Sequence, residues 1–382
     1  MVDWNIIRKE FPLTKKLLYF HSAAVSPIPN VVLNAIFDSY RKLNEEGEIN
    51  WEQDIESYQR VLSKFARYIN TDKNNLCFMW NTSTAMSVIA LSFLRKHKAN
   101  FNIVSMEDEF PSSTVPFEYQ NIKVKYVKSQ NGRYSLESIM QQIDSETIAV
   151  VTSYVQYCTG FKQDLQKLGA ELQQRKILFI VNATQAFPFY PIDVSKMNID
   201  VMTASIHKWG FTGHVGSICY LSTEFRRRYE TPFCGWLSLE AKDGIHTGKN
   251  VPLTLKTSAD VYTVGTINLQ AINALNITCD FLESVGFENI RNRIFELTDL
   301  LILGLIKRNV KIVSPVSNCA ERSAIVVFNV PEKSSEELVA FFKAKNIYVG
   351  LRNDNIRIAL NIFNNENDIE YLLKVLSDFV DG

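Results

Sequence analysis

The sequence predicts an α/β protein with a mainly parallel, doubly wound sheet, followed by a smaller α+β domain. Between about residues 75 and 225, short apolar runs alternate with helix-like segments, which is the pattern of βα units in a parallel sheet. After about residue 255 the pattern changes to a long helical region followed by isolated strands and helices. With 382 residues, 46% of them hydrophobic, the chain is long enough for one large and one smaller domain.

Local patterns predict each element of the first domain. Runs rich in β-branched and aromatic residues predict strands at 76–80, 101–106, 148–155, 177–181 and 200–205. Helical spacing of apolar residues predicts helices at 31–44, 51–69, 85–96 and 165–176. Because ligands of such sheets bind beyond the carboxyl ends of the strands, the polar residues that follow each strand should meet in one crevice.

The C-terminal part is expected to form the smaller domain. Its expected elements are a helical region at 269–308, a strand at 323–330, a helix opened by the capping box Ser334–Glu337, a strand at 355–363 and a helix at 366–379. We place the large domain at 18–255 and the smaller one at 256–382, and we expect residues 1–17 to pack on the smaller one.

Composition excludes several classes of protein. Lys plus Arg and Asp plus Glu are 41 each, so no global field would attract nucleic acid. The six cysteines are scattered without a CxxC pair, which argues against a metal site or a disulfide framework and favours a reduced, cytoplasmic setting. The most apolar stretch, 300–305, is far shorter than the roughly 20 residues of a membrane span. We therefore expect no metal, no nucleic acid and no membrane.

The strongest chemical signal is Lys208, in the segment SIHKW after the strand at 200–205. A lysine at a strand end among small and aromatic residues can be desolvated, which leaves its amine neutral enough to attack an aldehyde. A lysine in a loop is by itself more often a solvated surface residue. A functional role for Lys208 therefore depends on the residues at the ends of the neighbouring strands.

Polar and aromatic residues follow four other expected strands. Asn81–Thr84 precede a helix, where hydroxyls and free N–H groups suit a phosphate, although an ordinary helix cap has the same composition. Phe110 would stack on a flat ring or pack in the core. Three amides, Gln156, Asn182 and Gln185, would bind a heteroaromatic ring or satisfy nearby backbone. The Walker A and GxGxxG patterns are missing, which disfavours a Rossmann-type nucleotide enzyme.

Together these segments resemble the class V branch of the fold-type I pyridoxal-phosphate (PLP) enzymes, which includes cysteine desulfurases, kynureninases and isopenicillin N epimerase-like proteins. The resemblance runs from YFHSAAVSPIP (19–29) to NIRIALNIFNNENDIE (355–370). It implies that Lys208 carries the cofactor as a Schiff base. It also implies that Thr82 and Ser83 form the phosphate-binding turn, with Ser205 and His207 beside the phosphate.

The same resemblance assigns the remaining cofactor contacts. Phe110 occupies the place of the residue that stacks on the pyridine ring, and Gln156 and Gln185 match residues that approach its 3-oxygen. Gly265 and Thr266 are similar to a motif that reaches the phosphate of the neighbouring subunit. The resemblance therefore implies a homodimer with shared active sites.

Arg357 matches the arginine that grips the carboxylate of an amino acid substrate, which a guanidinium binds with two parallel hydrogen bonds. The alternative is a structural ion pair with Asp354 or Glu366. Further candidates for the substrate side are His21, Trp236 and Arg352.

Two departures from the family pattern bear on activity. The stretch KNIYVGLRNDN (345–355) has no cysteine where desulfurases carry a mobile thiol, and Cys319 lies well upstream. Asn182 stands where the family has an aspartate paired with the pyridine nitrogen, and an amide supplies no charge to stabilise the protonated ring. Chemistry without a strong electron sink, degeneration, or a substituted residue would each explain Asn182.

From these features we expect an enzyme acting on the amino group or Cα of an amino acid by transamination, epimerisation or C–S/C–X bond cleavage, and not a cysteine desulfurase. The alternative is a PLP-binding protein of low or no activity, because Asn182 replaces the ring-nitrogen aspartate.

Overall fold

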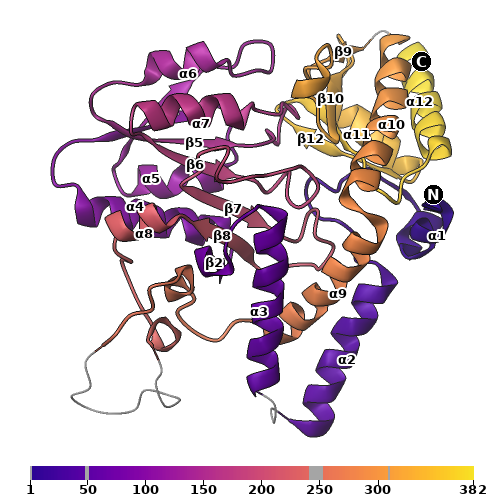
Figure 1. The fold of residues 1–382 in the computed structure, drawn as a ribbon. Coiled ribbons are helices and arrows are strands. Elements are labelled where there is room, and N and C mark those ends of the chain that lie inside the picture. The colour runs from indigo at the N-terminus through magenta and orange to yellow at the C-terminus, as the bar shows by residue number, and fades with distance from the viewer. Residues whose placement is uncertain (1, 48–50, 241–252, 309) are drawn as a thin grey trace.

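The large domain of the computed structural model is built around a seven-stranded sheet; the structure describes residues 2–47, 51–240, 253–308 and 310–382 (Figure 1). The strand order is β2-β8-β7-β6-β5-β3-β4, and among the described strands of this sheet β8 alone runs opposite to the others. The strands are β2 (Leu76–Met79), β3 (Asn102–Met106), β4 (Lys123–Val127), β5 (Thr147–Ser153), β6 (Leu178–Asn182), β7 (Val201–Ser205) and β8 (Ser217–Leu221).

Both faces of this sheet are buried against helices. Successive residues of one strand enter different cores: Phe78 belongs to one apolar cluster and Cys77 to the other, as the two-residue period of a strand requires. The first cluster includes α3 (Trp51–Tyr68), α6 (Leu136–Gln142) and α7 (Leu165–Gln174). The second includes α4 (Thr82–Lys96), α5 (Val115–Tyr119) and α8 (Thr223–Arg228). In Figure 1, α6 and α7 lie above the sheet, and α4, α5 and α8 lie to the left of β7 and β8. The predicted doubly wound, mainly parallel sheet is confirmed.

The C-terminal part contains a four-stranded antiparallel sheet of order β12-β13-β10-β9. Its strands are β9 (Lys311–Ile312), β10 (Ile325–Asn329), β12 (Gly350–Arg352) and β13 (Asn355–Ala359). Its core is closed by α10 (Phe287–Ile306), α11 (Ser335–Ala344) and α12 (Glu366–Asp381). The α11 helix begins at Ser335, with Ser334 accepting a hydrogen bond from the Glu337 amide.

The helical region expected at 269–308 is not one helix. It consists of α9 (Leu269–Val285) and α10, which meet at Gly286. Gly286 has φ +85°, a conformation that side-chain-bearing residues rarely adopt, so the chain changes direction there. Figure 1 shows the result: α9 packs beside α2 (Asn30–Glu46) and α3, whereas α10 continues into the smaller domain.

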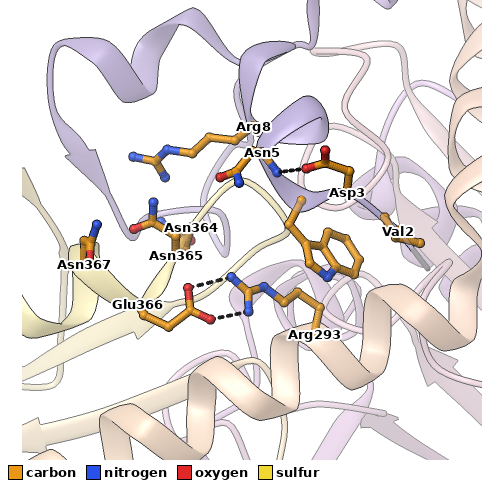
Figure 2. A pocket seen from close by; sticks show the side chains of 10 residues that line it. Val2, Asp3, Asn5, Arg8, Arg293, Asn364, Asn365, Glu366 and Asn367 are labelled. Atoms are coloured by element: carbon orange, nitrogen blue, oxygen red, sulfur yellow. Dashed lines mark hydrogen bonds and ion pairs between the residues drawn. The ribbon is translucent and has the colours of Figure 1, made fainter.

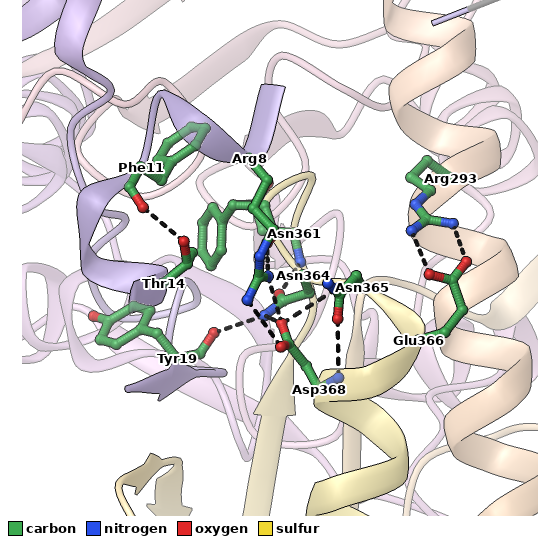
Figure 3. A network of polar contacts seen from close by, with 11 residues as sticks. Arg8, Phe11, Thr14, Tyr19, Arg293, Asn361, Asn364, Asn365, Glu366 and Asp368 are labelled. Atoms are coloured by element: carbon green, nitrogen blue, oxygen red, sulfur yellow. Dashed lines mark hydrogen bonds and ion pairs between the residues drawn. The ribbon is translucent and has the colours of Figure 1, made fainter. Parts of the chain in front are cut away.

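The segments at the two ends of the chain are held together. The short strand β1 (Leu18–Tyr19) pairs in parallel with β11 (Ile347–Tyr348). From α1 (Trp4–Lys9), the Arg8 guanidinium donates to both carboxylate oxygens of Asp368 at 2.7 and 3.0 Å and to the Phe363 carbonyl (Figure 3). This bidentate ion pair fixes α1 against the start of α12.

A cavity of about 590 Å³ lies at the same place, and we call it the junction cavity. It is lined by residues 2–5, Arg8, Arg293 and 364–367. Arg293 donates to both oxygens of Glu366 at 2.5 and 3.0 Å, and Figure 2 shows this pair on the cavity wall. In the part of the chain that the structure describes, no helix has the length and apolar character to cross a membrane.

Candidate active site

A second cavity, of about 320 Å³, lies at the carboxyl ends of β5, β6 and β7, between the start of α4 and the β12–β13 hairpin. We call it the site cavity. Its lining brings together nine of the residues that the sequence singled out: Thr82, Ser83, Phe110, Asn182, Gln185, Ser205, His207, Lys208 and Arg357. Eight of them follow or end strands of the seven-stranded sheet, so the strand ends converge as the parallel topology requires, and Arg357 joins them from β13 of the smaller sheet.

Lys208 lies in the turn after β7 and is only 9% exposed. Burial, with smaller contributions from the Arg357 and Arg352 cations, lowers the pKa of Lys208 to about 7. Its Nζ lies 5.1 Å from the centroid of the Phe110 ring. A large fraction of this amine is therefore neutral at physiological pH, as a nucleophile or a base requires.

Four hydroxyl groups form a buried cluster beside the start of α4. We call Thr82, Thr184, Ser205 and Ser217 the hydroxyl cluster. The Ser205 hydroxyl lies 2.9 Å from the hydroxyls of both Thr82 and Ser217, and the Ser205 amide donates to Thr184 Oγ1 at 3.1 Å. Thr184 and Ser217 were not predicted; Thr184 follows a strand as the other candidates do, whereas Ser217 begins the antiparallel β8. Hydroxyls beside a helix N-terminus suit an anionic oxygen group.

The side-chain amides of Asn182 and Gln185 are held in defined orientations. Asn182 accepts from the Thr184 amide at 3.1 Å and donates to the Ser113 hydroxyl at 3.0 Å. Gln185 donates to the Ala23 carbonyl at 2.9 Å and accepts from the Trp209 indole at 3.0 Å. The second N–H of each amide remains available for a ligand. Ser113 and Trp209, which fix these orientations, were not singled out from the sequence.

Gln156 and Thr266 lie outside the lining of the site cavity. Gln156 is 1% exposed and donates at 2.7 Å to Glu109, a buried carboxyl that also accepts from the Ser153 amide at 2.6 Å. Burial raises the pKa of Glu109 despite these hydrogen bonds. Thr266 is exposed on the surface of this chain.

His207 contacts a second histidine, His214, which no motif of the sequence had singled out. The ring centroids of His207 and His214 are 4.5 Å apart, and both residues line the site cavity. Burial, together with Lys208 and His214, lowers the pKa of His207 to about 4, so its imidazole is neutral at pH 7.

Arg357 faces the site cavity from β13 and is 1% exposed. One of its Nη atoms donates to the Tyr157 carbonyl at 3.0 Å, whereas its Nε and other Nη atoms are buried without a hydrogen-bond partner. The alternative ion pair is not formed: Glu366 pairs with Arg293, and neither Glu366 nor Asp354 lies within 4.0 Å of the guanidinium. The free edge of Arg357 is therefore open to an anion from outside the protein.

Of the three other candidates for the substrate side, one lines the site cavity and two do not. Arg352 lines the site cavity. His21 lies beside Arg357 but is not part of the lining, and burial and the two arginine charges lower the pKa of its imidazole to about 4. Trp236 lies elsewhere, with its ring stacked on Trp51 at a centroid distance of 6.0 Å.

The chemistry of the lining fits an anionic aromatic ligand such as PLP. Hydroxyls and a helix N-terminus lie at one side, a lysine with a lowered pKa and an aromatic ring lie at the centre, and two guanidinium groups, of which Arg357 has two nitrogens without a hydrogen-bond partner, lie at the other side. None of the residues that line the cavity is acidic.

Comparisons with known proteins agree with this geometry. The Aminotransferase class-V family model matches residues 18–372. A probable cysteine desulfurase from Pyrococcus abyssi (strain GE5 / Orsay) is 23% identical over 400 residues, covering 98% of this chain and 97% of that protein. The apo structure of a cysteine desulfurase from Thermococcus onnurineus NA1 superimposes with a TM-score of 0.90 at 21% identity, over 100% of this chain and 99% of that one.

A third similar protein is the cystine C–S lyase C-DES, solved in complex with its reaction product cysteine persulfide. It has a TM-score of 0.86 at 19% identity, covering 96% of this chain and 99% of that one. Another structure of C-DES, a mutant, holds glycine covalently linked to the PLP cofactor. The predicted class V resemblance and fold-type I architecture are confirmed by these matches.

The expected function is corrected by the same matches. Excluding cysteine desulfurases was wrong, because cysteine desulfurases recur among both the sequence relatives and the solved structures. Of the expected reactions, transamination, epimerisation and C–S/C–X bond cleavage, the names of these relatives point to chemistry at sulfur, and they do not support the alternative of a nearly inactive PLP-binding protein. The missing thiol in 345–355 does not decide the question, because C–S lyase chemistry also occurs among the similar proteins, as in C-DES with its reaction product cysteine persulfide.

Proposed function

Because the chain belongs to the Aminotransferase class-V family, we propose that it is a PLP-dependent enzyme of desulfurase type, which removes sulfur from a sulfur-containing amino acid. The observation that carries this proposal is the pairing, within one cavity, of a buried lysine of lowered pKa with a buried arginine that lacks a counter-ion. PLP, when bound, withdraws electrons from the bonds at Cα of an amino acid attached to it.

Each group of residues in the site cavity has a separate role in the proposed reaction. Lys208 would hold the cofactor through its amine, and the same amine, when free, would take or return a proton at Cα. The hydroxyl cluster, Ser83 and the start of α4 would hold the phosphate. Phe110 would cover one face of the ring. Arg357 binds the α-carboxylate, which fixes the orientation of Cα and of the neighbouring C–S bond.

Asn182 and Gln185 set the environment of the cofactor ring. Asn182, whose side chain is oriented by Ser113 and Thr184, would offer the cofactor ring a hydrogen bond without a negative charge. Gln185, fixed by Ala23 and Trp209, would offer a second amide N–H. A ring held in this way would be a weaker electron acceptor than one paired with a carboxylate.

We also propose a homodimer in which Thr266 of each chain contacts the phosphate of the other. The exposure of Thr266 outside its own site cavity supports this arrangement. Co-expression of Lys208→Ala chains with Thr266→Val chains tests it, because a mixed dimer would contain one site free of both substitutions. Activity above that of either variant alone is expected; monomeric protein in sedimentation analysis, or no gain on mixing, would contradict the proposal.

The proposed reaction is tested with purified protein loaded with PLP. The protein should show a visible absorbance band, and sulfide or persulfide should be released from L-cysteine or L-cystine. Lys208→Ala is the control: turnover should fall by roughly 10⁴-fold or more while the circular dichroism spectrum is unchanged. Borohydride reduction followed by peptide mapping should place the cofactor on Lys208. A coloured protein that releases sulfur from neither amino acid would refute the desulfurase-type activity.

A further inference from the structure

Two arginines lie on the same face of the β12–β13 hairpin. Gly350 is directly opposite Arg357, so Arg352, two residues further along β12, points to the same side of the sheet as Arg357. The hairpin closes through a two-residue turn, in which Asn353 and Asp354 have φ values of +47° and +56°. The segment that lacks a cysteine is thus a short, tightly turned hairpin that places both guanidinium groups at the site cavity.

Gly350 makes room for this arrangement. A Cβ atom at this position would lie 3.2 Å from Arg357 Nε and 3.1 Å from His21 Nδ1, closer than ordinary van der Waals contact. The missing side chain leaves Arg357 free to extend toward the cavity, and an Arg352 Nη atom donates to the Leu351 carbonyl at 2.6 Å, which restricts its direction.

The positive charges of the hairpin have no carboxylate partner among the described residues. Neither arginine forms an ion pair within 4.0 Å there, and no lining residue is acidic. Two acidic residues follow β3. Asp108 reaches the turn of the hairpin, where it accepts from the Asn353 side-chain amide at 3.4 Å, and it also accepts from the Tyr134 hydroxyl at 2.9 Å, but it forms no ion pair within 4.0 Å with either arginine; Glu109 accepts from Gln156. Burial and the nearby Arg352 lower the pKa of Arg357 to about 9, so it remains charged at neutral pH.

The junction cavity provides the contrasting case. Its two arginines, Arg8 and Arg293, are each bound bidentately by a carboxylate of α12 (Figures 2 and 3). A buried cation is costly without a counter-charge, and in the junction cavity the fold supplies one. In the site cavity the ligands must supply it.

After the phosphate of the cofactor and the α-carboxylate of the substrate are assigned to their binding groups, one arginine of the site cavity has no anionic partner. With the phosphate held at the hydroxyl cluster and the α-carboxylate on Arg357, Arg352 still lacks an anion. Resting on the proposed function, we propose that Arg352 binds a second anionic group at or beyond the sulfur, so that the substrates are sulfur amino acids with two anionic groups, of which L-cysteine sulfinate and L-cystine are representatives.

The test compares Arg352→Gln with the unchanged protein on two groups of compounds. For L-cystine and L-cysteine sulfinate, the KM should rise by about 10- to 100-fold, the range for a lost charge-assisted hydrogen bond. For L-cysteine and S-methyl-L-cysteine, which have one carboxylate and no second anion at neutral pH, the KM should change far less. Arg352→Lys should recover part of the loss. Equal losses for both groups, or no loss, would overturn the inference.

A binding measurement separates this inference from the proposed function. In the PLP-loaded Lys208→Ala protein, calorimetric titration with L-cystine and L-cysteine sulfinate should show the same 10- to 100-fold weakening when Arg352→Gln is added. Arg8→Gln, in the junction cavity, is the matched control and should leave these affinities unchanged. If no sulfur amino acid is turned over but the weakening is seen, only the proposed reaction fails; if turnover occurs and the weakening is absent, only the role of Arg352 fails.

Discussion

Each of the two cavities contains two arginines, and the cavities differ in what those arginines contact. In the junction cavity, both guanidinium groups are bound by carboxylates of α12, so the charges are neutralised within the fold. In the site cavity, Arg352 and Arg357 share a face of a hairpin with no carboxylate partner among the described residues. The ion pairs of the larger cavity therefore connect α12 with α1 and α10, whereas the arginines of the smaller cavity can bind anionic ligands.

Replacing Arg357 with methionine should produce the largest effect. Loss of the bidentate carboxylate contact should lower kcat/KM for sulfur amino acids by about 100-fold. The free energy of unfolding should change by less than about 1 kcal/mol, because removing an uncompensated buried charge offsets the lost hydrogen bond to Tyr157. Steady-state kinetics and urea unfolding of the same preparation measure both quantities. Marked destabilisation with unchanged kinetics would mean that Arg357 is structural.

Asp368→Asn should give the opposite result in the junction cavity. The substitution leaves Arg8 without its partner at 2.7 Å and should cost about 2 kcal/mol of unfolding free energy, less than a fully buried pair because Arg8 is partly exposed. The kcat/KM should remain that of the unchanged protein. Urea unfolding checks the first expectation, and a parallel loss of activity in the still-folded protein would show that the two cavities are not independent.

The pH dependence of cofactor attachment should reveal the smallest effect. Because burial and the two arginine charges lower the pKa of Lys208 to about 7, the amine is protonated below that pH and neutral above it. The initial rate of growth of the visible band after PLP is added to apoprotein should therefore rise as the pH passes through about 7. Arg352→Gln removes one of the neighbouring cations and should move this midpoint upward. A midpoint near the 10.5 of a solvated lysine would contradict the burial of Lys208.

The convergence of the strand-end residues on one cavity could be predicted from the sequence because these residues lie at the ends of parallel strands. Thr82, Ser205 and Lys208 each occur just after an apolar run, and a parallel sheet brings such positions together. Ser217 was missed because it begins the antiparallel β8, whose direction is set by pairing with β2 and β7 and not by its own residues.

Other features depend on contacts that local patterns do not encode. Gln156 was expected near the ring, but its partner is the buried Glu109, 47 positions away. The ion pair considered for Arg357 was plausible by sequence distance, yet Glu366 contacts Arg293 from another helix. Gly286 is typical of a residue that follows the end of a helix, but the apolar pattern continues on both sides of it, so the end of α9 was not predicted. The domain boundary near residue 255 stays a prediction.

The parallel pairing of β1 with β11 has a consequence for the order of assembly. Leu18 is placed opposite Ile347, so this two-stranded sheet needs segments more than 300 positions apart, and the Arg8–Asp368 pair needs the beginning of α12. During synthesis on a ribosome, the seven-stranded sheet emerges long before the hairpin with its arginines. The phosphate-binding half of the site can thus fold while the substrate-binding half is still being translated. The Arg8–Asp368 ion pair of α1 can form only after α12 has been synthesised.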